Sequence, residues 1–116
     1  MAEITRELTT VTVGGTEYTL VPTLAAVRAV TAACGGLLPA FRKVQDLDLD
    51  AMASIIVAGA RLTLTAKEYD ALAGAVWKTE KKGPIGSACI DFLSLLLNGG
   101  RSVEDEVDGA EAEGNV

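Results

Sequence analysis

The chain has 116 residues, of which 49% are apolar and 22% are charged, a composition that can build one hydrophobic core and differs from that of disordered proteins. It contains no histidine, which excludes Ser/His/Asp and Cys/His catalytic sites and the zinc sites that need histidine. Its net charge of −6 argues against duplex DNA and anionic membranes as partners, because both are negatively charged.

The first predicted element is a β-hairpin. Two β-rich runs, at 8–13 and 16–21, flank Gly14-Gly15, and glycine readily adopts the positive φ that both central positions of a type I′ turn need. This turn predicts a register that pairs Val11 with Tyr18. A lone hairpin is marginal in water, so its apolar face must pack on helices or on other copies of itself. That face consists of Val11, Val13, Tyr18 and Leu20.

Two short helices are predicted next. Thr23 has the side chain of a helix N-cap and Gly35 suits a left-handed C-cap, so the first helix should span 24–34. The second should span about 37–45. Spacings of three and four residues predict these inward-facing side chains: Leu24, Val27, Val30, Thr31 and Cys34 in the first helix, and Leu37, Leu38, Phe41 and Val44 in the second.

Three further helices follow. Acidic residues, which are favoured at the positive end of a helix, precede a helix of about 49–61. A capping box at Thr65–Glu68 opens a helix of about 66–78. Gly83-Pro84 then breaks the chain before the last helix, 85–97.

The end of the chain differs in composition. Residues 101–116 contain one basic and six acidic side chains, a net charge of −5, and few apolar residues to bury. We therefore expect a disordered acidic tail at 101–116 and a single folded domain at 8–100. The predicted class is mainly α (α+β): an N-terminal two-stranded antiparallel hairpin followed by about five short helices in one compact domain.

No motif predicts a cofactor, a metal ion or a catalytic residue, so we expect a protein that is not an enzyme. The acids at 46, 48 and 50 alternate as in a calcium loop, but Ala51 and Val57 stand where such a loop needs glycine and glutamate. Cys34 and Cys89 lie in apolar helical patterns, which favours packing over a disulfide. The N-terminus has no apolar core of a secretory signal, and the best apolar stretch, 51–60, is too short to span a membrane. The expected location is the cytoplasm.

Two features suggest protein partners. Nine of the thirteen residues of the last helix are apolar, so either this helix is central or the edge of its apolar arc, at Ile90 and Leu97, meets a second chain. Trp77 stands at the edge of its helix's apolar stripe and is expected to be partly exposed, either as a partner contact or as a cap on the core. The lysines that follow it, within 78–82, are interpreted as a solvated loop in preference to a nucleic-acid contact.

The order of these elements and their amino-acid sequences resemble a known family. The segment Val11-Thr-Val-Gly-Gly-Thr-Glu-Tyr-Thr-Leu-Val-Pro-Thr-Leu-Ala-Ala-Val27, followed by Ala33-Cys-Gly-Gly-Leu-Leu38 and a leucine-rich final helix, is similar to the tail assembly chaperones of long-tailed bacteriophages and gene transfer agents. The likeness covers about residues 8–99. The acidic tail has no counterpart in the pattern.

The resemblance implies a non-enzymatic helical protein of the bacterial host's cytoplasm that binds the tape measure protein, keeps it soluble during virion tail assembly and is absent from the mature particle. Many such chaperones also have a frameshift-extended form. The resemblance transfers no binding residue, so the predicted partner-binding residues remain Trp77, Ile90 and Leu97, with self-association expected as well. The alternative is a structural subunit of the virion tail or head-to-tail connector, whose hairpin would pair edge to edge in a ring.

Overall fold

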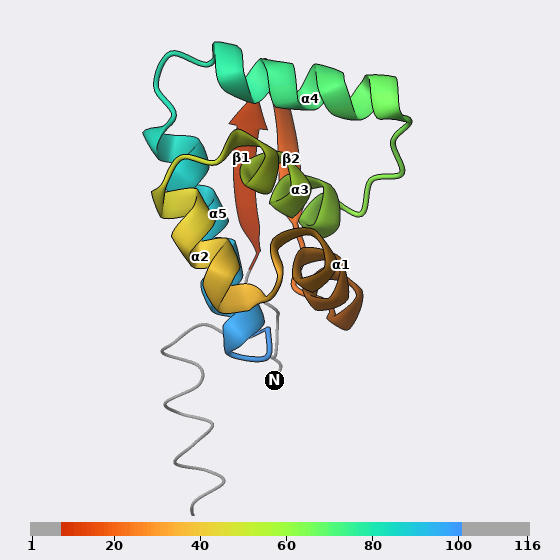
Figure 1. The fold of residues 1–116 in the computed structure, drawn as a ribbon, viewed down its shortest axis with the longest axis vertical. Helices are drawn as coiled ribbons and strands as arrows, with labels where there is room; N and C mark the ends of the chain where they lie inside the picture. Colours follow the sequence, from red (N-terminus) through yellow and green to blue (C-terminus); the bar gives the residue numbers. More distant parts are fainter. Residues whose placement is uncertain (1–7, 101–116) are drawn as a thin grey trace, which may run out of the picture.

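The computed structural model describes residues 8–100, and Figure 1 shows a two-stranded hairpin and five helices in one compact domain. This confirms the predicted fold class, whereas the predicted disorder at 101–116 lies outside the described residues. The elements are β1 (Thr9–Val13), β2 (Thr16–Leu20), α1 (Leu24–Cys34), α2 (Leu37–Gln45), α3 (Leu49–Ala60), α4 (Ala66–Lys78) and α5 (Gly83–Leu97).

The hairpin has the predicted register and the predicted turn. Val11 pairs with Tyr18, and Gly14 and Gly15 both have positive φ, at 60° and 83°. One face of the hairpin is buried against helices, through Val11, Val13 and Leu20, while Tyr18 is half-buried. The opposite face is exposed and polar, and consists of Thr10, Thr12, Glu17 and Thr19.

Side-chain caps explain where three of the helices begin. The hydroxyl of Thr23 accepts a hydrogen bond from the backbone N–H of Ala26 at 3.0 Å, which satisfies one of the free donors at the start of α1. At the start of α3, the carboxylate of Asp48 accepts a hydrogen bond from the backbone N–H of Ala51 at 3.0 Å. At α4 the predicted capping box forms, because the side chains of Thr65 and Glu68 each accept from the other's backbone N–H, at 3.1 and 2.8 Å respectively.

The central helix is α3. It contacts α1, α2, α4, α5 and β2, and half of its residues are buried. The last helix, α5, packs mainly against α2 and β1 (Figure 1), and Ser87, Asp91 and Leu97 on its outer side are exposed. Helix α5 also contributes seven buried residues to the core, while Leu97 at the edge of its apolar arc is exposed.

Three predictions of inward-facing side chains are wrong. Leu24, Thr31 and Leu38 are exposed, whereas Ala26 and Ala40 are fully buried. Each leucine precedes its alanine by two positions, which places the two side chains about 200° apart around the helix, so both cannot face the core. The small alanines lie where α1 and α2 pack into the domain, and the leucines are left outside.

Two helix boundaries also differ from those predicted. Helix α5 begins at Gly83 and not at Ile85, since Pro84 lies in the first turn, where a backbone N–H is not needed. Helix α3 ends at Ala60, because Arg61 adopts the left-handed conformation of a C-cap, with φ of 58°. Within residues 8–100 no single helix has the length and apolar content to cross a membrane. Helices α1 and α2 have sufficient length and apolar content only when they are counted together, and the chain bends by 63° between them.

Candidate functional site

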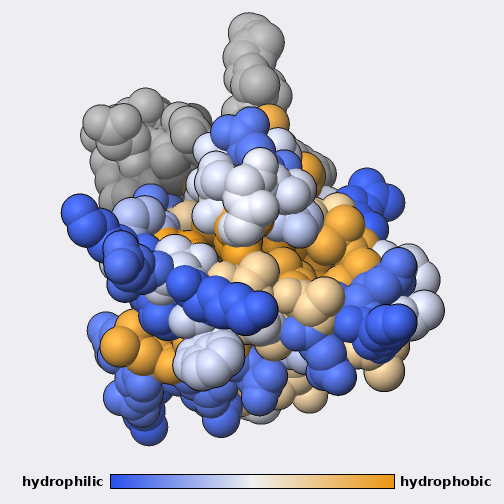
Figure 2. All heavy atoms as spheres, turned by 90° about the horizontal axis from the view of Figure 1, so that it is seen from above, coloured by the Kyte–Doolittle hydropathy of each residue, from blue (hydrophilic) through white to orange (hydrophobic). Residues whose placement is uncertain are grey.

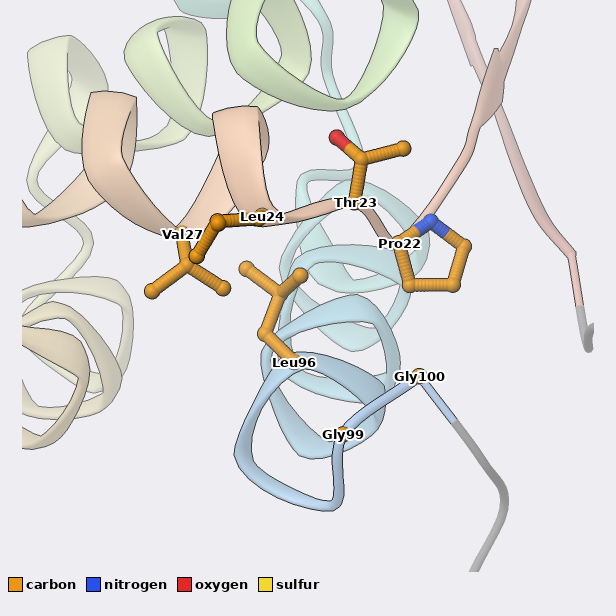
Figure 3. A pocket seen from close by; sticks show the side chains of 7 residues that line it. All are labelled: Pro22, Thr23, Leu24, Val27, Leu96, Gly99 and Gly100. Atoms are coloured by element: carbon orange, nitrogen blue, oxygen red, sulfur yellow. The ribbon is translucent and has the colours of Figure 1, made fainter.

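An apolar groove lies between the first turn of α1 and the C-terminal end of α5 (Figure 3). Its volume is about 220 Å³. Leu24 and Val27 of α1 point toward Leu96 of α5, and Pro22 and Thr23 form the side next to β2. Leu96 and Pro22 are buried and make the floor, whereas Leu24 is 63% exposed and stands at the rim.

The end of α5 closes one side of the groove. The N–H of Gly99 donates to the carbonyl of Leu96 at 3.2 Å and that of Gly100 to the carbonyl of Leu95 at 2.6 Å, the pattern of a Schellman motif. Both glycines have positive φ, at 70° and 90°, which turns the chain back across the helix end. A Cβ added at Gly100 would lie 3.7 Å from Pro22, so this turn packs against the chain just before α1.

The groove suits apolar side chains from another polypeptide. None of the residues that line it carries a charge. Its volume is below the roughly 300–1,000 Å³ typical of small-molecule sites. A partner that covers Leu24 and Val27 would remove apolar surface from water, which is favourable by about 25 cal/mol per Å². The groove can therefore bind a partner through hydrophobic contacts.

A second hollow, of about 320 Å³, lies between the hairpin and α4. Val13 and Tyr18 line it from the hairpin, and Leu72 lines it from α4. The chain between α3 and α4 adds Leu62 and Leu64, whose side chains are half-buried. Glu68 also lines this hollow, so unlike the α1–α5 groove it carries a charge, and its large apolar side chains are less exposed than Leu24.

The predicted partner-binding residues do not form one surface. Trp77 is 64% exposed on α4, as expected of a residue at the edge of the stripe. Leu97 is 53% exposed at the end of α5, while Ile90 is half-buried and packs against the core. Helix α4 and the C-terminal end of α5 lie at opposite ends of the molecule (Figure 1), so Trp77 and Leu97 cannot contact one small partner segment together.

Exposed apolar side chains are spread over the domain. On the face drawn in Figure 2, apolar residues gather in patches that hydrophilic residues separate. The large apolar side chains exposed among residues 8–100 are Leu8, Leu24, Leu38, Leu47, Trp77 and Leu97.

The groove was missed by the sequence prediction because Leu24 fits the helical spacing of Val27 and Cys34. That spacing is compatible with either of two neighbouring faces of α1, and only the packing of Ala26 against the core selects one of them. The nearest sequence signal is the position of Leu24 directly after the N-cap, at the helix end farthest from the Gly35 stop. This position alone does not identify a groove.

The two cysteines have the environment predicted for packing. Both are free and buried, and burial raises the pKa of each thiol, that of Cys89 to about 12. A thiol that stays protonated is a poor nucleophile and metal ligand. Among residues 8–100, no group of three or more His, Cys, Asp or Glu side chains is arranged to hold a metal ion.

Comparison of the chain with protein-family models, with curated proteins and with solved structures found no match.

Proposed function

We propose that the protein is a non-enzymatic tail assembly chaperone that binds the tape measure protein and keeps it soluble in the cytoplasm of the bacterial host. The observation that carries the proposal is the uncharged groove between α1 and α5, with the exposed side chain of Leu24 at its rim. A long helical client exposes apolar faces before the tail tube encloses it. An apolar groove between two helices is a common way to hold such a face.

The test is co-expression with a tape measure protein, followed by measurement of the soluble fraction of that protein. We expect the chaperone to raise that fraction and to co-purify with the client. Leu24→Asp should abolish both effects, because it places a charge on the apolar rim. Leu38→Asp is the matched control, since Leu38 is equally exposed but does not line the groove.

A structural subunit of the virion tail or connector is the second candidate, and the hairpin favours it. The sheet in residues 8–100 has two strands, so each strand has one edge without a neighbouring strand. Open edges present unpaired backbone groups to another chain, and the outer face here contains three threonines and a single charged residue, Glu17. Recovery of the protein in purified particles, without any gain in client solubility, would favour this candidate over the chaperone.

A further inference from the structure

We infer that the exposed face of α4 binds the same face of a second copy of the chain, with the two helices antiparallel about a two-fold axis at Gly74. Each copy supplies the same patch to such a contact. The inference goes beyond the proposed function and is independent of it. Helix α4 and the α1–α5 groove lie at opposite ends of the domain (Figure 1), so the dimer leaves both grooves open.

The outer face of α4 is centred on Gly74. Leu72 and Val76, which are buried, stand two positions before and after Gly74 and therefore about 160° from it around the helix. A Cβ built on Gly74 meets nothing within 4 Å, so the space above this position is open. Within residues 8–100, α4 packs mainly on α3 and β1, which leaves its outer face without a neighbouring element.

Four exposed residues surround Gly74 in two pairs, each symmetric about it along the helix. Asp70 and Lys78 lie four positions before and after it, about 6 Å along the axis. Ala71 and Trp77 lie three positions before and after it. All four are within about 60° of Gly74 around the helix. A two-fold axis at Gly74 therefore brings each residue opposite the other member of its pair in the second copy.

Both pairs are complementary. Asp70 of each copy meets Lys78 of the other, so opposite charges face each other at two places. Within residues 8–100 neither side chain makes a hydrogen bond or an ion pair, and the two are about 12 Å apart along one helix, too far to pair with each other. Trp77, which is 64% exposed, meets Ala71, so the largest side chain of the face packs over one of its smallest.

The like charges of the antiparallel pair lie at its ends. Lys67 and Glu68 come opposite positions 81 and 80 of the second copy, which are also a lysine and a glutamate. Those positions follow Lys78, the last residue of α4, so the chain there is not held along the partner helix. Each lysine also has a glutamate of the other copy beside it, which offsets the repulsion.

Other partners of this face fit less well. A parallel pair of helices would bring Asp70 opposite Asp70 and Lys78 opposite Lys78, which like-charge repulsion opposes. An acidic partner at the lysines within 78–82 would also meet Glu80. The ammonium of Lys82 already donates to a backbone carbonyl at 2.7 Å, so that cluster offers few free cations.

Sedimentation equilibrium of the full chain between about 5 µM and 1 mM measures the dissociation constant of the dimer. Trp77 is the one tryptophan of the chain, so its fluorescence reports the contact directly. We expect the emission to shift to shorter wavelength as the dimer forms, and iodide to quench it less, because the ring leaves water. Trp77→Ala should raise the dissociation constant at least about tenfold.

Charge reversal tests the register of the two helices. Asp70→Lys and Lys78→Asp should each raise the dissociation constant at least about tenfold, because each brings like charges together at both places. An equimolar mixture of the two variants should regain the affinity of the wild type, since every such contact in the mixed dimer again joins opposite charges. Arg28→Asp, at an exposed position of α1, is the matched control and should change nothing.

Three results would overturn the inference. One is a wild-type chain that stays monomeric at about 1 mM, which would mean that no second copy covers the face. Another is a dimer that Trp77→Ala and both charge reversals leave unchanged. The third is a mixture of the two charge variants that stays monomeric although each variant unfolds at the temperature of the wild type. None of these results affects the co-expression test of the chaperone, because Leu24 is not part of this face.

Discussion

Leu20 of β2 lies against Gly59 of α3 so closely that no larger residue fits at position 59. A Cβ built on Gly59 would lie 2.8 Å from the Cβ of Leu20 and 2.9 Å from the ring of Phe92. The N–H of Val21 also donates to the carbonyl of Gly59 at 2.9 Å. This contact is where the hairpin joins the central helix, so the glycine sets the distance between the two layers.

Gly59→Ala should therefore destabilise the domain, by about 1–3 kcal/mol, because overpacking outweighs the better helix propensity of alanine. Gly74→Ala in α4 is the matched control: a Cβ there meets nothing within 4 Å, and the change should stabilise by about 0.5–1 kcal/mol. Chemical denaturation measures both. If Gly59→Ala is as stable as Gly74→Ala, the close contact is absent in solution.

Leu47, which follows α2, has a φ of 60°, a left-handed conformation that is costly for leucine. Its side chain is exposed, so little packing is lost on truncation. Leu47→Gly should stabilise the domain by about 0.5–1 kcal/mol, whereas Ala29→Gly, at an exposed position inside α1, should destabilise it by about 1 kcal/mol. Thermal unfolding gives the comparison, and a loss of similar size in both variants would contradict the left-handed geometry.

Three leucines of α5 should respond differently to truncation. Leu93 and Leu96 are buried, so Leu93→Ala and Leu96→Ala should each cost about 2–5 kcal/mol. Leu97→Ala should cost about 1 kcal/mol or less, because Leu97 is largely exposed, and should weaken any self-association through that edge. Unfolding curves measure the losses of stability, and sedimentation measures the change in self-association. Equal losses in all three variants, with unchanged oligomer size, would mean that the helix is wholly internal.

Cys89 predicts how stability depends on pH. Burial raises the pKa of its thiol from an ordinary value of 9.0 to about 12, so the folded state favours the protonated form. The contribution is complete below pH 9 and is lost as the pH rises toward 12, by up to about 1.4 kcal/mol per pH unit, because only the unfolded chain releases the proton. Denaturation of the wild type and of Cys89→Ala at pH 8 to 11 isolates the slope. Parallel pH profiles for the two proteins would show that Cys89 is not buried.

Local signals in the sequence were enough to predict the elements. The Gly14-Gly15 turn sets the register of the hairpin, and the caps at Thr23 and Thr65 set where α1 and α4 begin. Each of these features depends on residues within a few positions of one another, so its geometry follows from backbone sterics and short-range hydrogen bonds. The exposed position of Trp77 follows in the same way, from helical periodicity.

Tertiary packing alone decided which face of each helix is buried and where the groove lies. Leu24 and Ala26 both satisfy helical spacing, and the close packing of α1 in the domain selects the smaller one. The groove needs the start of α1 and the end of α5, segments about seventy residues apart in the chain, to lie side by side. The spacing of apolar residues within one helix cannot predict how two distant segments are placed relative to each other. That placement depends on close contacts between elements, such as the one between Leu20 and Gly59.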